Sequence, residues 1–315
     1  MVNSIGLNYQ VMGIEAMRNF FHSHGFKEIL TPPAVENPGM ETHIHPFQLY
    51  QCKQSKLSQL YLHTSPEFEM KQVLAQVREL SKIYTISYCF RDEPHSPHHR
   101  NQFLMLEWYR RDANYFAIMD DIENLVNSLK TQFDKDTIKF ERRTIQDIVQ
   151  EYANFDILAF EDASELKNKI SKDLKSVPLP SQDCEYDDYF FLIFLNLIEP
   201  HLKNHPYLIL SEYPAPLAAL STIKENDPRV CERFECYIKG IEIANCFNES
   251  TDLIEITNRF KQQAKFKKET YGYELSAPEQ FFQMMERGYP NSAGVALGVE
   301  RLMGTLFNLE NPFYR

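Results

Sequence analysis

Three glutamates, Glu235, Glu242 and Glu249, follow one another at intervals of seven residues. A two-residue turn at 239–240 would place Tyr237 opposite Glu242 in a hairpin. Glu235 and Glu242 would then be diagonal neighbours on one face, close enough to share a cation. Two carboxylates together with the phosphates of a nucleotide are ligands that Mg²⁺ prefers. The same spacing also fits three solvated glutamates on an exposed sheet face.

Arginines and glycines near predicted strand ends indicate phosphate binding. Arg91 opens the sequence Arg-Asp-Glu at the end of a predicted strand, and a guanidinium fork matches the geometry of a phosphate. Gly294 and Gly298 flank Val-Ala-Leu just before a predicted helix that carries Arg301. Glycine lets a backbone approach a ligand, and a helix N-terminus favours phosphate. The alternatives are a surface ion pair for Arg91 and close strand–helix packing for the two glycines.

The predicted loop 92–101 contains His95, His98 and His99, which could bind a metal ion. No cysteine or carboxylate framework completes a tetrahedral set around them. We therefore interpret this segment as a polar loop.

Predicted strands and helices alternate along the chain and would position these residues. Periodicity and breaker residues predict helices at about 9–24, 66–77, 118–129, 251–268 and 279–288, and strands at about 27–30, 47–51, 60–63, 82–91, 102–111, 207–211 and 233–247. The spacing of Ser276 and Glu279 is that of a capping box for the last of these helices, which Gly288 would end.

Two regions refine the predicted fold. In strands 82–91 and 102–111, alternate residues mix polar and aromatic side chains on one face, including Thr85 and Glu107. Residues of about 140–205 are predicted to be mainly helical, and the apolar middle of 186–202 predicts a buried helix. The pattern predicts an α+β fold with a largely antiparallel sheet flanked by helices.

Composition restricts the class of protein. The 315 residues carry a net charge of −11 and 43% hydrophobic residues, a balance typical of a globular chain. A sequence pI near 5.4 argues against broad binding to a nucleic acid backbone. The longest apolar run is too short for a membrane span, and no secretory signal is visible. Six cysteines without a CxxC pair indicate reduced thiols and a cytoplasmic protein.

The order of these motifs resembles that of a known family. FRDE at 90–93, FLMLEWY at 103–109, GIEIANCFNESTD at 240–252 and GVALGVERL at 294–302 are similar to the class II aminoacyl-tRNA synthetase core, and HTSPEFEMK at 63–71 to its amino-acid-binding segment. The chain resembles the lysyl branch. The resemblance implies one catalytic domain over 1–315, a helical insertion at about 140–205 and no anticodon-binding domain. Ala296 and that missing domain resemble the truncated paralogues that attach (R)-β-lysine to elongation factor P.

The resemblance also implies residue roles. It assigns ATP binding to Arg91, Asp92, Glu93, Arg100, Phe103, Glu242, Ile243, Gly298 and Arg301. Among these, Arg91, Glu242 and Arg301 would be catalytic, and Glu235 with Glu242 would bind Mg²⁺. Phe103 would stack on adenine. The amino-acid pocket would be lined by Ser65, Pro66, Glu67, Tyr109 and Glu249, whose carboxylates suit the ammonium groups of a diamino acid.

Three residues depart from the family pattern. Arg100 stands where the family usually has asparagine, which changes how the nucleotide is held. Cys246 replaces a usual glycine and adds bulk beside the pocket, and Ser250 replaces a common leucine.

The resemblance implies an ATP-dependent ligase that forms an aminoacyl adenylate of (R)-β-lysine and transfers it to a lysine side chain of elongation factor P. A homodimer through residues of about 19–32, no membrane association and no tRNA binding are expected with it. One alternative is a free-standing lysyl-tRNA synthetase-like enzyme that uses α-lysine with tRNA or a small acceptor. Another is a catalytically silent paralogue that only binds a partner.

Overall fold

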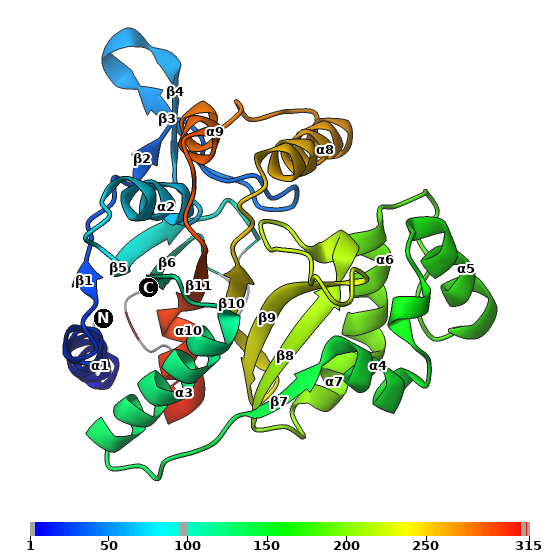
Figure 1. The fold of residues 1–315 in the computed structure, drawn as a ribbon, viewed down its shortest axis with the longest axis horizontal. Coiled ribbons are helices and arrows are strands. Elements are labelled where there is room, and N and C mark those ends of the chain that lie inside the picture. Colours follow the sequence, from blue (N-terminus) through cyan, green and yellow to red (C-terminus); the bar gives the residue numbers. More distant parts are fainter. Residues whose placement is uncertain (1–3, 95–99, 310–312, 314–315) are drawn as a thin grey trace. The chain divides into compact units, whose positions relative to one another are not determined.

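The computed structural model describes residues 4–94, 100–309 and 313, and Figure 1 shows its elements. The chain folds into two compact units. Unit 1 comprises Met1–Ile118 with Glu249–Arg315, and unit 2 comprises Met119–Asn248. The expected single catalytic domain with a helical insertion stays a prediction.

The strands of unit 1 confirm the two long strands expected on either side of the polar loop. β5 (Lys82–Phe90) pairs antiparallel with β6 (Gln102–Arg111), and β6 pairs antiparallel with β11 (Ser292–Gly298). The short β1 (Lys27–Glu28) lies parallel to β5. Thr85 is opposite Glu107, so the polar face predicted from alternation exists as expected.

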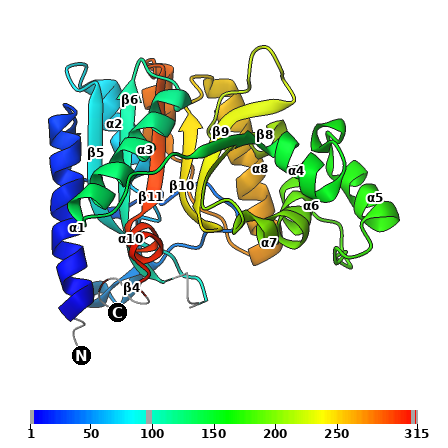
Figure 2. The same cartoon turned by 90° about the horizontal axis from the view of Figure 1, so that it is seen from below.

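Helices and a small sheet complete unit 1. The helices are α1 (Ser4–Ser23), α2 (Glu67–Gln76), α8 (Leu253–Tyr271), α9 (Glu279–Glu286) and α10 (Val299–Phe307). The small sheet has the order β2 (Ala34–Val35), β4 (Lys56–Leu62), β3 (Gln48–Gln51). α1 runs beside β5 (Figure 2), where the ring of Phe21 stacks on Tyr84 at 4.6 Å. This buried aromatic contact fixes α1 against the strands.

Unit 2 is built on a second set of strands. Its order is β7 (Glu141–Thr144), β8 (Tyr207–Pro214), β9 (Val230–Ile238) and β10 (Ile241–Asn248), with β7 parallel to β8 and the other pairs antiparallel. The boundary between the units falls within α3 (Tyr115–Gln132). With the pairings of unit 1, this confirms an α+β fold with largely antiparallel strands.

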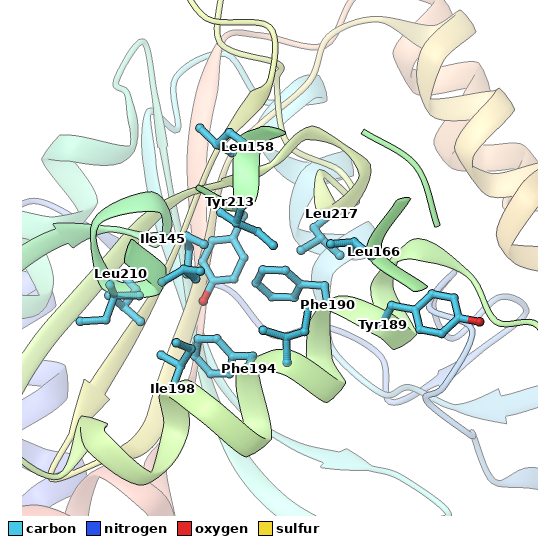
Figure 3. Packing of buried hydrophobic residues seen from close by; sticks show 14 of the residues in the cluster. Ile145, Leu158, Leu166, Tyr189, Phe190, Phe194, Ile198, Leu210, Tyr213 and Leu217 are labelled. Atoms are coloured by element: carbon cyan, nitrogen blue, oxygen red, sulfur yellow. The ribbon is translucent and has the colours of Figure 1, made fainter. Parts of the chain in front are cut away.

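Helices of the 140–205 region pack on these strands in unit 2. They are α4 (Ile145–Ala153), α5 (Ala163–Asp173), α6 (Tyr186–Ile193) and α7 (Glu199–Leu202), with a π-helical turn at Phe194–Ile198. Figure 3 shows their buried side chains, including Phe190 and Phe194, gathered against Tyr213 of β8. Removing this apolar surface from water stabilises the unit.

The 140–205 region is mainly helical as expected, with the short strand β7 at its start paired to β8. Two other sequence expectations were wrong in part. The 186–202 segment is not wholly buried, since Phe191 and Leu195 are 36% and 50% exposed on its outer face. Ser276 forms no capping box, because Pro278 takes the N-cap position of α9.

The helices in the described ranges include none that is long and apolar enough to cross a membrane.

Candidate active site

The β9–β10 hairpin has the register that the sequence predicts for Glu235 and Glu242. Lys239 and Gly240 form its two-residue turn with φ of 51° and 80°, the positive values that this turn type requires. Tyr237 is opposite Glu242, and a bulge after Glu242 shifts the register beyond it. Glu242 thus lies diagonal to Glu235 on the hairpin.

Glu235 is buried and accepts three hydrogen bonds from protein donors. Its Oε1 lies 2.7 Å from the guanidinium of Arg233, and its Oε2 accepts the hydroxyls of Tyr213 and Tyr237 at 2.6 and 2.5 Å. The guanidinium also lies 4.6 Å from the centroid of the Tyr213 ring. Burial, followed by the charge of Glu235, raises the pKa of Tyr213 and Tyr237 well above the usual range, so both hydroxyls donate at neutral pH.

This arrangement limits how Glu235 could bind a metal ion. Two tyrosine hydroxyls fill the lone pairs of Oε2, and Arg233 takes one of those on Oε1. Glu235 therefore has room for one further bond at Oε1, while Glu242 is only half-buried. The pair fits a cation held chiefly by Glu242 and the ligand's own oxygens. No cluster of three or more His, Cys, Asp or Glu side chains able to hold a metal ion occurs among the described residues.

Arg91 stands at the end of β5 beside Phe103 of β6. Its guanidinium lies 5.2 Å from the centroid of the Phe103 ring. Asn101 closes the base of the loop by donating to the carbonyls of Arg91 and Glu93 at 3.0 and 2.9 Å. The buried Nε of Arg91 has no hydrogen-bond partner in the part of the chain that the structure describes. A buried donor of this kind fits an anionic acceptor such as a phosphate oxygen.

α10 begins at Val299, with Gly298 at its N-cap position, and carries Arg301 as the sequence predicts. Glu300, one residue before Arg301, accepts the backbone N–H of Leu104 at 2.9 Å with each carboxylate oxygen. This bond fixes the start of α10 next to Phe103. Burial raises the pKa of Glu300 to about 7.

The predicted amino-acid pocket is assembled around a buried lysine. Lys71 of α2 lies 2.7 Å from Oε1 of Glu67 and 2.6 Å from Oε2 of Glu249. Tyr109 donates to Oε1 of Glu107 at 2.8 Å beside them. The structure therefore gathers Glu67, Tyr109 and Glu249, three of the five residues expected to line the pocket.

Glu107 adds a carboxyl group to this pocket. It is 1% exposed, and its Oε2 has no hydrogen-bond partner among the described residues. The same holds for Oγ1 of Thr85 on the opposite strand. Burial, then the charge of Glu67, raises the pKa of Glu107 well above its usual range. Its unpartnered Oε2 is available to a polar ligand group.

Gly294 makes room for this arrangement. A Cβ atom at this position would lie 2.1 Å from the Tyr109 ring and 2.9 Å from Oε1 of Glu249. The backbone of β11 thus approaches the pocket side chains, which is the close packing that the sequence left as an alternative for this glycine. At Gly298 a Cβ atom would make only ordinary contacts with Arg301, at 3.7 Å and beyond.

The remaining predicted residues are placed as follows. Ser65 and Pro66 lie directly before α2, with Pro66 at its N-cap position, and Ile243 is buried in β10. Asp92 is exposed, and Glu93 and Arg100 are half-buried. His95, His98 and His99 lie outside the described residues.

Sequence reasoning missed four functional candidates: Lys71, Arg233, Glu107 and Glu300. Lys71 follows Glu67 by four residues, a spacing that usually indicates a surface ion pair on a helix. The sequence pattern placed Glu107 on a strand face but assigned it no function. Only long-range packing shows that Lys71, Arg233 and Glu107 are buried and that each of the four contacts or neighbours a predicted site residue.

Comparison with known proteins agrees with this geometry. The family of class II tRNA synthetases (D, K and N) matches residues 3–311. A protein of Hamiltonella defensa subsp. Acyrthosiphon pisum (strain 5AT), named elongation factor P--(R)-beta-lysine ligase, is 31% identical over 300 residues, 95% of this chain and 90% of the relative. Proteins with the same name in Proteus mirabilis (strain HI4320) and Yersinia enterocolitica (serotype O:8 / biotype 1B) are 31% and 32% identical, covering 96% and 91% of this chain and 93% and 86% of the relatives. The chain therefore belongs to the class II tRNA synthetases of the D, K and N group.

Proposed function

We propose that this protein is an ATP-dependent ligase that activates (R)-β-lysine as an adenylate and transfers it to a lysine side chain of elongation factor P. The observation that carries the proposal is the acidic pocket of the half-buried Glu67 and the buried Glu249, because carboxylates shielded from water pair strongly with ammonium groups. The names of relatives that match 95% and 96% of the chain support the same activity.

The first step joins the amino acid to AMP. The carboxylate of the amino acid attacks the α-phosphorus of ATP, and pyrophosphate leaves. Arg91 would stabilise the charge that develops on the α-phosphate, since its buried Nε lacks a partner among the described residues. Arg301 would hold the nucleotide from α10. Asp92, Glu93, Arg100, Phe103, Ile243 and Gly298 complete the proposed ATP-binding set.

The second step forms an amide bond. A neutral lysine ε-amine of the protein substrate attacks the carbonyl carbon of the adenylate, AMP leaves, and the amine loses a proton. No covalent nucleophile of the enzyme is required, because positioning of the two reactants supplies much of the acceleration.

Mg²⁺ is part of the proposal as the partner of ATP. Bound Mg²⁺ neutralises phosphate charge. Glu242 would supply its main protein ligand, and Glu235 the remaining position on Oε1. The Arg233–Glu235 pair keeps the hairpin face in place for this role.

A homodimer is proposed for the α1 side of unit 1. Ile5 and Val11 on α1 are 62% and 59% exposed, and Leu30 after β1 is 88% exposed. We propose these exposed apolar side chains as candidates for the contact with a second copy, next to the expected segment of about 19–32. The cytoplasm is the proposed location, because the six cysteines are free thiols.

A lysyl-tRNA synthetase-like enzyme is the second candidate, favoured by the family match itself. It would use α-lysine and bind tRNA. The net charge of −11 favours a protein acceptor over a polyanion.

Intact-protein mass spectrometry of elongation factor P tests the transfer. The proposal predicts a mass increase equal to one β-lysyl group that depends on the enzyme, ATP and (R)-β-lysine together. An unchanged mass of the factor from the same organism, or charging of tRNA in its place, would contradict the proposal.

A further inference from the structure

Lys71 is buried, unlike the lysine of an ordinary surface ion pair. It is 1% exposed, and its ammonium is within 2.7 Å of Glu67 and 2.6 Å of Glu249. Glu67 lies on the same helix, whereas Glu249 follows β10 and is 178 residues away in the sequence (249 − 71). The ring of Phe281 from α9 lies 5.8 Å from the ammonium. The lysine thus joins two segments that each contribute a carboxylate to the proposed pocket.

The charges explain why a cation is needed there. Two carboxylates that share one buried site cannot both ionise without a counter-ion. Burial alone would lower the pKa of Lys71, but Glu249 and Glu67 together raise it above its ordinary value, so the ammonium stays charged. Burial raises the pKa of Glu249 to about 7, although Lys71 opposes that rise. Without Lys71 the pKa of Glu249 would rise further.

We propose that Lys71 is the positioning residue of the amino-acid pocket, where it bridges Glu67 and Glu249 and holds both carboxylates ready for the ammonium groups of a diamino acid. This inference rests on the proposed function for its substrate class. Lys71 acts through the two glutamates and touches no reacting atom. Two acidic side chains around a single ammonium make a site whose acidic groups outnumber its cation, which suits a cationic ligand.

The other groups around Lys71 do not replace it. Tyr289 faces it from the segment before β11, and burial raises the pKa of this phenol, so it is neutral. Tyr109 and Glu107 face the pocket from β6, where burial raises the pKa of both groups well above the ordinary values, and neither supplies a positive charge. Lys71 is therefore the cation that pairs with both Glu67 and Glu249 among the groups described here, and it opposes the rise in the pKa of Glu249.

The enzymatic test compares Lys71→Met with Lys265→Met in ATP–pyrophosphate exchange. Lys265 has the same i,i+4 spacing to an acid, Glu269, but both side chains are exposed. We expect Lys71→Met to raise the KM for (R)-β-lysine at least tenfold at pH 7, with kcat changed less than threefold. This pattern is expected because the lost interaction holds the bound substrate and its transition state equally well. The KM of this variant should fall as the pH approaches 9, since Glu249 then ionises. Lys71→Arg should restore part of the affinity, and Lys265→Met should match wild type.

An NMR measurement tests the bridge even if Lys71→Met folds poorly or the wild-type enzyme is inactive. In protein labelled with ¹⁵N-lysine, the Nζ resonance of Lys71 should persist to high pH and shift in Glu249→Gln, but not in Glu255→Gln on the surface of α8. If the wild-type enzyme shows no pyrophosphate exchange with any amino acid tested, the proposed function fails. The Nζ spectrum then tests the bridge by itself. An unmoved Nζ resonance, or an unchanged KM in Lys71→Met at pH 7, would overturn the inference.

Discussion

Glu300 of α10 and Leu104 of β6 are joined by a two-oxygen hydrogen bond. Both carboxylate oxygens of Glu300 lie 2.9 Å from the backbone nitrogen of Leu104. The contact spans 196 residues of sequence and joins the helix that carries Arg301 to the strand that carries Phe103. It fixes two proposed ATP-binding side chains relative to each other within unit 1.

Substitution Glu300→Gln should change the pH dependence of stability. Burial raises the pKa of Glu300 from 4.5 to about 7, so its protonated form is favoured in the folded state. A carboxyl group whose pKa is raised by folding contributes stability that is complete below its unfolded pKa of 4.5. That stability is lost as the pH rises through about 7. The neutral Gln variant should therefore equal wild type near pH 4 and exceed it by up to about 3 kcal/mol at pH 8. Urea unfolding at both pH values measures this, and parallel pH profiles would contradict it.

Substitution Arg91→Ala should remove a catalytic donor. We expect the rate of ATP–pyrophosphate exchange to fall by about 10²–10³-fold, because one preorganised donor to developing charge has an effect of that size. Arg142→Ala is the matched control, since Arg142 pairs with Asp120 on the surface of unit 2. That variant should keep the wild-type rate. Equal rates for both variants would rule out the proposed role of Arg91.

Substitution Gly294→Ala should disturb the amino-acid pocket. The added Cβ would lie 2.1 Å from the Tyr109 ring, so the ring must move. Overpacking of a buried site destabilises by about 1–3 kcal/mol. Thermal unfolding should show this loss for Gly294→Ala but not for Gly298→Ala, where the added atom meets only ordinary contacts. A fully stable Gly294→Ala protein would mean that the close approach of β11 is unimportant.

Substitution Arg233→Met should destabilise the protein more than Arg229→Met. Arg233 and Glu235 form a buried pair at 2.7 Å, whereas Arg229 and Asp227 form an exposed pair at 2.8 Å. Breaking a buried pair leaves an uncompensated charge and typically costs about 3–5 kcal/mol. An exposed pair contributes about 0–1 kcal/mol. Chemical denaturation of both variants checks the difference, and similar losses would speak against a structural role for Arg233.

Local signals predicted the hairpin and the long strands. The Lys239–Gly240 turn followed from glycine and alternation, and it placed Tyr237 opposite Glu242 as the structure does. Alternation in residues 82–91 and 102–111 likewise placed Thr85 and Glu107 on one face. In these cases neighbouring residues and a period of two determine the outcome.

Features that depend on distant packing were not predictable. Lys71 becomes a bridge only because a segment 178 residues later (249 − 71) delivers Glu249 to it. β7 pairs with β8, a strand distant from it in the sequence. The capping box at Ser276 was wrong because Pro278, which lies between Ser276 and Glu279, takes the N-cap position itself. Long-range contacts thus decided the parts of the site that motifs did not reveal.

The most direct test of the central claim is amino-acid-dependent ATP–pyrophosphate exchange with (R)-β-lysine and α-lysine as competing candidates. This assay isolates adenylate formation and needs no acceptor. The account predicts exchange that depends on the amino acid and a clear preference for (R)-β-lysine in kcat/KM. Preference for α-lysine, or no exchange with either compound, would contradict it.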